Sequence, residues 1–259
     1  MRVAPVSRCC LVRMVAAAMA CALLSLPAQG MPPFRAVTAN LPPFATDPRG
    51  DNPGALTEVV EELARRVSAP MRVELVPWKR AMLLSEHQQR LAIFPLTRSS
   101  EREPKFRWLV RLFQENTIFV ANAGRNDIDV QNPGSLKQYS VAVVRGSAHV
   151  AQLRADGMTR LVEVTDVQGA VKMVRDGIVD LLYGSETIFR DLPAAMGYTE
   201  NMFKYGPPAH AVDIWLGGSL DFTEADAAEF QAAMKSMQKD SSYMRILKKY
   251  KLTSPVLPR

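Results

Sequence analysis

Cysteine is scarce in this chain and is confined to one end of it. The three cysteines, Cys9, Cys10 and Cys21, all lie within the first 30 of 259 residues. Residues 31–259 can therefore form no disulfide bond, no thiolate metal site and no cysteine nucleophile.

Histidine is equally scarce, with His87, His149 and His210 as its only examples. None has the spacing of a metal-ligand pair, and the sequence lacks the common hydrolase, phosphate-loop and dinucleotide motifs. His149 lies two residues after Ser147, which could form a nucleophile–base pair, but such a site also needs an orienting acid and an oxyanion hole. We therefore expect no enzyme, no catalytic residue, no metal and no cofactor.

An excess of one charge is also missing once the first 30 residues are set aside. Arg2, Arg8 and Arg13 account for three of the 32 basic residues, which leaves 29 basic against 26 acidic residues and a net charge of +3. The densest basic stretch, 248–251, has the pattern of a helix terminus, where cations interact favourably with the dipole. We expect no nucleic-acid binding, because that function usually needs a concentrated basic face.

The first 30 residues have the pattern of a cleavable secretory signal peptide. A basic start precedes an apolar run over 15–26, which is too short to span a bilayer. Small residues follow, so we expect cleavage after Gly30, with Ala28 as the nearby alternative. A membrane anchor or a buried helix is the competing interpretation of this segment. No second apolar run of 18 residues occurs, so we expect a soluble periplasmic protein after cleavage.

Strand-like and helix-like segments alternate from residue 34 onward. A first set has strands at 34–40, 71–76 and 91–96 and helices at 56–67 and 78–84. A second set has strands at 139–144, 161–164 and 179–183 and helices at 148–154, 168–175 and 188–196. Further strands are expected at 116–122 and 211–216, and a final helix at 225–238.

Two signals mark expected helix starts. Asp51 or Asn52 is placed to cap the helix at 56–67, and Thr223 with Asp226 resembles a capping box before the last helix.

This alternation indicates an α/β fold made of two αβ units of similar size. The chain crosses between them twice, near 116–122 and near 205–216. Two crossings favour a second lobe inserted into the first through a two-strand hinge, and a single doubly wound sheet is the alternative.

Four local motifs carry a resemblance to a known family. They are Leu-Pro-Pro-Phe at 41–44, Val-Pro-Trp-Lys-Arg-Ala at 76–81, the Thr and Glu-Arg segment at 94–103, and Val-Val-Arg-Gly-Ser at 143–147. In this order and spacing, residues 34–252 resemble the family 3 extracellular solute-binding proteins, which bind polar amino acids and related solutes. The resemblance implies a two-lobed type II periplasmic binding fold, with a mixed sheet flanked by helices in each lobe. It places lobe 1 at 31–120 and 207–259 and lobe 2 at 121–206, in a monomer.

Arg102 is the residue to which the resemblance assigns the ligand's carboxylate. Its planar guanidinium can bind a carboxylate through two parallel hydrogen bonds and keeps its charge. The hydroxyl of Thr97 can add a donor to the same oxygens. The alternative is a surface arginine paired with Glu101 or Glu103.

The other motifs supply the rest of the expected site. A strand-to-helix turn at Gly146 and Ser147 offers close backbone approach and unpaired N–H groups. Aromatic walls are expected from Phe44 and Trp78, for which core packing is the alternative. Arg80 is a second polar contact or a hinge residue. The complete expected ligand-binding set is Phe44, Trp78, Arg80, Pro95, Thr97, Arg102, Gly146, Ser147, Tyr183 and Ser185.

The sequence departs from the family pattern where amino-acid binders have an aspartate for the ligand's ammonium group. Ser185 occupies that position, with Glu186 beside it, and a neutral serine does not balance a buried ammonium. Either Glu186 takes the role in a shifted register or the ligand is not a standard α-amino acid. Ala148 and Leu41 replace a hydroxylic and an aromatic residue, so we expect a pocket less polar than usual.

The resemblance thus predicts a protein that captures a small carboxylate-bearing solute, an amino acid or a derivative, for an ABC-type membrane permease. The alternative is a ligand-sensing module that signals to a membrane receptor without transport. The fold would be the same in both cases.

Overall fold

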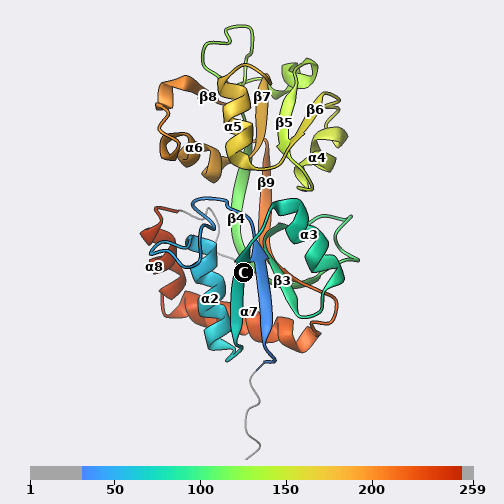
Figure 1. The fold of residues 1–259 in the computed structure, drawn as a ribbon, viewed down its shortest axis with the longest axis vertical. Helices are drawn as coiled ribbons and strands as arrows, with labels where there is room; N and C mark the ends of the chain where they lie inside the picture. The colour runs from blue at the N-terminus through green and yellow to red at the C-terminus, as the bar shows by residue number, and fades with distance from the viewer. Residues whose placement is uncertain (1–30, 253–259) are drawn as a thin grey trace, which may run out of the picture. The chain divides into compact units, whose positions relative to one another are not determined.

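The computed structural model describes residues 31–252, and the expected signal peptide with its cleavage site lies outside them. Residues 32–252 belong to one compact unit. Its first set of strands is β1 (Phe34–Thr38), β2 (Met71–Leu75) and β3 (Leu91–Thr97), which pair in parallel in the order β2-β1-β3 (Figure 1).

Two helices accompany these strands, α2 (Ala55–Arg66) and α3 (Trp78–His87). The apolar positions of α2 that carry its helical spacing are fully buried. The predicted cap at Asp51 or Asn52 is wrong, because Gly54 precedes the helix directly and no side chain caps it. Gly54 has φ 100°, and a Cβ there would lie 2.5 Å from the carbonyl oxygen of Phe44, so glycine is required by this close approach.

Two long antiparallel strands connect the two sets of elements. They are β4 (Arg107–Asn122), green in Figure 1, and β9 (His210–Gly218), orange. The first part of β4 pairs with β9, and its last residues, from Thr117 on, pair with β7 and β8. The strand order β2-β1-β3-β9-β4-β7-β5-β6 is therefore continuous, because β4 is long enough to belong to both sets.

The second set contains β5 (Val141–Val144), β6 (Leu161–Val164), β7 (Leu181–Ser185) and β8 (Phe203–Tyr205). Its helices are α4 (His149–Ala155), α5 (Val167–Arg175) and α6 (Glu186–Ala195), with 3-10 turns η1 (Pro133–Gln138) and η2 (Glu200–Met202). A core of its own packs under β5 and β7 and includes Phe119, Leu136 and Leu153.

The chain returns through β9 to the first set and ends in α7 (Glu224–Lys239) and α8 (Ser242–Lys249). The predicted capping box is confirmed: Thr223 Oγ1 accepts from the Asp226 N–H at 3.1 Å, and Asp226 Oδ2 accepts from the Thr223 N–H at 2.7 Å. Lys248 and Lys249 lie in the last turn of α8, as predicted. Within residues 31–252, no helix combines the length and apolar character that crossing a bilayer requires.

Candidate functional site

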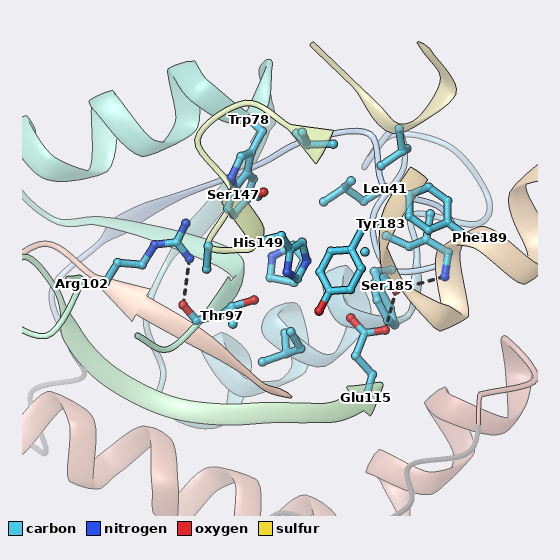
Figure 2. Close-up of a pocket in the computed structure, with 18 residues that line it drawn as sticks. Leu41, Trp78, Thr97, Arg102, Glu115, Ser147, His149, Tyr183, Ser185 and Phe189 are labelled. Carbon is cyan, nitrogen blue, oxygen red and sulfur yellow. Dashed lines mark hydrogen bonds between the residues drawn. The ribbon is translucent and has the colours of Figure 1, made fainter. Parts of the chain in front are cut away.

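A cavity of about 80 Å³ lies where the ends of β3, β5 and β7 approach β4 (Figure 2). On the scale of 10–15 Å³ for one water, it holds roughly five to eight water-sized groups. Eight of the ten residues expected at the site line it: Phe44, Trp78, Pro95, Thr97, Arg102, Ser147, Tyr183 and Ser185.

The other two expected residues, Arg80 and Gly146, do not line the cavity. The Arg80 side chain is exposed to solvent on α3. Gly146 contributes only its backbone carbonyl, which accepts hydrogen bonds from Trp78 Nε1 at 3.3 Å and from Arg102 Nη2 at 3.0 Å. The structure therefore does not place Arg80 where it could contact a ligand in this cavity.

Arg102 is the cation of the cavity. It lies in the turn after β3, only 5% exposed, and its Nη1 donates to the carbonyl oxygen of Thr97 at 2.8 Å. Burial lowers its pKa to about 10, so it remains a cation at neutral pH. Among residues 31–252 no carboxylate forms an ion pair with it, and Glu103 is bonded to Arg98 instead. The alternative of an exposed arginine paired with Glu101 or Glu103 does not fit this geometry.

The indole of Trp78 and the backbone carbonyl of Gly146 bring the two sets of elements into contact. Trp78 is the first residue of α3 and is 6% exposed, so its ring is both a cavity wall and part of a core cluster. Gly146 has φ 77°, and a Cβ there would lie 3.1 Å from Cδ of Lys79. Glycine is therefore favoured at this turn by its backbone conformation and by the close approach of α3.

Glu115 is a cavity residue that the sequence reasoning missed. It lies on β4, is buried, and accepts a hydrogen bond from Ser185 Oγ at 2.5 Å. Burial raises its pKa to about 8 despite hydrogen bonds from Ser185 and Thr187, and the nearby Glu186 adds to the increase. Glu115 lies between Gln114 and Asn116, just before the strand predicted at 116–122, so no local pattern marks it as a buried strand residue.

Glu186, which was considered for the missing ammonium partner, does not line this cavity. Its carboxylate accepts from Asn116 Nδ2 at 3.1 Å and from Arg190 Nε at 2.9 Å, in a neighbouring groove. Ser185 Oγ accepts from the Ile188 N–H at 3.1 Å and so also caps α6.

Ser147 and His149 do not form a nucleophile–base pair. Ser147 Oγ is buried without a hydrogen-bond partner among the described residues. The His149 ring instead packs edge-on against Tyr183, with ring centroids 5.5 Å apart. Burial, with Arg102 nearby, lowers the His149 pKa to about 4, so the ring is neutral at neutral pH. Tyr183 is bonded to Thr117 Oγ1 at 2.6 Å, and burial raises its pKa to about 12.

The remaining walls are apolar, which agrees with the expected low polarity. They are Leu41, Val144, Ala148, Val167, Gly184, Ile188, Phe189 and Ile214. Across residues 31–252, no three His, Cys, Asp or Glu side chains gather in a way that could hold a metal ion.

No protein-family model and no curated protein sequence matches this chain. Solved structures match its fold. The arginine-, lysine-, histidine-binding protein ArtJ from Geobacillus stearothermophilus has a TM-score of 0.76 at 13% identity, over 87% of this chain and 97% of its own. A histidine kinase sensor domain with similarity to periplasmic binding proteins has a TM-score of 0.76 at 14% identity, over 84% and 95%. The substrate binding protein of an amino acid ABC transporter has a TM-score of 0.72 at 12% identity, over 85% and 99%.

Identities this low establish the fold and leave the ligand open. The chain has the two-lobed type II periplasmic binding fold, and the fold predicted from the four motifs is confirmed.

Proposed function

We propose that this protein is a solute-binding protein, not an enzyme, and that its cavity captures a small carboxylate-bearing solute such as an amino acid or a derivative. The observation that carries the proposal is that Arg102 is a buried cation in a mostly apolar cavity. Within residues 31–252 its guanidinium donates to the backbone carbonyls of Thr97 and Gly146 and forms no ion pair. A buried charge without a counterion is costly, and a ligand carboxylate would supply that counterion.

The donors around Arg102 fit the same ligand group. The free Oγ of Ser147 and the side chain of Thr97 line the cavity with the guanidinium. Charge-assisted hydrogen bonds of this kind are the strong ones, and a bidentate arginine–carboxylate pair also fixes orientation. We propose that Phe44, Trp78, Pro95 and Tyr183 form the apolar walls, and that Ser185 acts through its neighbour Glu115.

Ligand capture is proposed to close the two lobes, 31–120 with 207–259 and 121–206, about β4 and β9. Support comes from the Gly146 carbonyl, which accepts from Arg102 and Trp78 across the cavity. In a closed state of this kind the ligand is removed from solvent. Small-angle scattering should therefore give a smaller radius of gyration with a tight ligand than without it, and equal values would contradict closure.

The proposed setting is the periplasm, after cleavage near Gly30, with a monomer that delivers its ligand to an ABC-type permease. The likeness to the substrate binding protein of an amino acid ABC transporter supports this role. The likeness to a histidine kinase sensor domain supports the second candidate, a sensing module that signals to a membrane receptor. Adjacent permease and ATPase genes would favour transport, and an adjacent sensor gene would favour signalling.

A thermal-shift screen of the protein from residue 31 onward tests the carboxylate requirement. The compounds are amino acids, small carboxylates and the corresponding carboxamides. A true ligand at 100 times its Kd stabilises the fold by about 2.7 kcal/mol. Carboxylates should stabilise and their amides should not; stabilisation by the amides alone would contradict the proposal. Recovery of the bound compound unchanged would agree with binding, and its turnover would indicate an enzyme.

A further inference from the structure

Arg102 is carried by an irregular connection in the chain. Residues 98–106 join β3 to β4 without a helix or strand, and the Arg102 side chain reaches from them to the cavity, where Nη1 donates to the Thr97 carbonyl oxygen (Figure 2). The backbone N–H groups of Arg102 and Glu103 both donate to the carbonyl oxygen of Ser99, at 2.9 and 3.1 Å. A binding group on a loop is positioned precisely only where side-chain contacts fix the loop. The contacts that fix this loop therefore bear on how Arg102 meets a ligand.

An ion pair closes the connection on either side of Arg102. Arg98, the first residue after β3, donates to Glu103 through Nε at 2.6 Å and through Nη2 at 3.1 Å, so both carboxylate oxygens are bound. This fork geometry restricts the relative orientation of the two side chains. Both side chains are nearly half exposed, and an exposed ion pair on its own contributes little. For the pair to hold the loop, further contacts must fix it.

Two tryptophans supply these contacts. Trp108, near the start of β4, donates from Nε1 to Oε2 of Glu103 at 3.0 Å. The Arg98 guanidinium lies 5.1 Å from the centroid of the Trp108 ring and 5.0 Å from that of Trp215 on β9, and the two rings pack edge to face. A cation at this distance from an indole is attracted to the face of the ring. The ion pair is thereby fixed to both long strands, β4 and β9.

Arg98 and Glu103 act from outside the cavity, because neither of them lines it. A ligand bound there would contact Arg102 and not the ion pair. Arg98 also binds the carboxylate that directly follows Arg102 in the chain, so this anion is paired elsewhere and the guanidinium of Arg102 is left to a ligand.

We infer that Arg98 is a positioning residue for ligand binding: through Glu103 it holds the loop that presents Arg102 to the cavity. The inference rests on the proposed function, in which Arg102 binds a ligand carboxylate. Because Arg98 acts only through that guanidinium, it contributes to the preference for a carboxylate and not to the affinity for the rest of the ligand. Trp108 and Trp215 support it from the strands, and a phenylalanine in place of Trp215 would keep an aromatic face against Arg98.

Matched carboxylate and carboxamide probes test the inference. They are propionate with propionamide, 3-methylbutanoate with 3-methylbutanamide, and L-alanine with L-alaninamide, in calorimetric titrations at pH 7. The parent should prefer the carboxylate in at least one pair. Arg98→Ala should weaken binding of that carboxylate roughly twofold to tenfold, the effect of one misaligned hydrogen bond, and leave the Kd of the carboxamide unchanged. Arg98→Lys should do the same, because lysine keeps the charge but cannot form the fork.

Arg35→Ala is the matched control. Arg35 on β1 binds Glu74 on β2 through the same two-bond fork, at 2.9 and 2.8 Å, with similar exposure, and it does not line the cavity. This variant should leave both Kd values unchanged, and urea unfolding reports the stability of every variant. Equal weakening of the carboxylate and the carboxamide in Arg98→Ala would indicate a merely structural ion pair and overturn the inference.

A double-mutant cycle tests the path through Glu103. If Arg98 acts through this carboxylate, Arg98→Ala combined with Glu103→Ala should weaken carboxylate binding no more than Arg98→Ala alone, and losses that simply add would overturn the inference. A parent that prefers no carboxylate would overturn the proposed function and this inference together. A preference that Arg98→Ala retains in full would overturn this inference alone.

Discussion

Nη2 of Arg102 lies 3.0 Å from the carbonyl oxygen of Gly146, so the turn after β3 and the turn after β5 are joined by the cation of the cavity. The same guanidinium is the proposed receptor for a ligand carboxylate. Ligand binding and the contact between the two turns therefore share one side chain, and substitutions on either side of this bond should affect affinity.

Trp78→Phe should weaken ligand binding without unfolding the protein. The change removes the Nε1–H that donates to the Gly146 carbonyl at 3.3 Å but keeps an aromatic wall. A typical net hydrogen bond contributes about 0.5–1.5 kcal/mol, so Kd should rise roughly twofold to tenfold. Isothermal titration with the ligand found in the screen measures the effect.

Trp215→Phe is the matched control for this substitution. Trp215 Nε1 is buried and has no hydrogen-bond partner in the described part of the chain, and the residue does not line the cavity. The Trp215→Phe variant should therefore bind the ligand with the same Kd as the unsubstituted protein. An unchanged Kd in Trp78→Phe, or an equal loss in both variants, would contradict the role given to the Gly146 carbonyl.

Gly146→Ala should lower both stability and affinity. A left-handed backbone costs a non-glycine residue about 1–2 kcal/mol, and the new Cβ would press against Lys79. Gly177→Ala is the matched control: Gly177 also has a left-handed backbone, with φ 68°, but a Cβ there would meet nothing within 4 Å. Urea unfolding should show a loss of about 1 kcal/mol or more in each variant. Titration should show weaker binding in Gly146→Ala only; equal affinities would mean that this turn does not contribute to closure.

Glu115 should lower the stability of the unliganded protein as pH rises from about 4.5 to 8, and the net loss should be clearest above pH 6.5, where His149 no longer opposes it. The folded-state pKa of Glu115 is raised from 4.5 to about 8, so the native state binds the proton more strongly than the unfolded state does. The free energy of unfolding then falls with pH by up to about 1.4 kcal/mol per unit. Urea unfolding at half-unit intervals measures the slope, and Glu115→Gln should flatten it.

His149 has the opposite effect between about pH 4 and 6.5, a range in which it offsets the contribution of Glu115. Its pKa is lowered from 6.5 to about 4, so the unfolded state binds the proton more strongly, and stability is lost as pH falls through that range. Because the contribution of Glu115 grows as pH falls through the same range, the stability of His149→Asn should rise relative to that of the parent between pH 6.5 and 4. The same pH dependence in the variant and the parent would argue against a neutral imidazole at this position.

The order of strands and helices could be predicted because periodicity and turn residues are local. The helix of α2, the capping box of Thr223 and Asp226, and most strands follow from such patterns. The first half of β4 was missed because Arg107, Arg111 and Gln114 interrupt its apolar residues. Its pairing with β9 over 107–117 is a long-range contact, which no local pattern reveals.

The site was predictable where a motif marks it and not where folding alone creates it. Arg102 and Ser147 follow from the motifs, and both line the cavity. Glu115 enters the cavity only because β4 pairs with β7, which places the strand beside Ser185. Arg80 shows the opposite case. It belongs to a motif and was therefore expected at the site, but its side chain on α3 is exposed to solvent.

The central claim is that Arg102 binds the carboxylate of the ligand, and one comparison of affinities tests it most directly. Calorimetric titration of the parent, Arg102→Ala and Arg80→Ala with the same carboxylate ligand isolates the contribution of the buried guanidinium. Loss of one partner of a buried charge pair costs about 2–5 kcal/mol, so Arg102→Ala should weaken binding by roughly 30-fold or more. Arg80→Ala, which removes an exposed cation outside the cavity, should leave Kd unchanged. Equal affinity in Arg102→Ala and the parent would contradict the account.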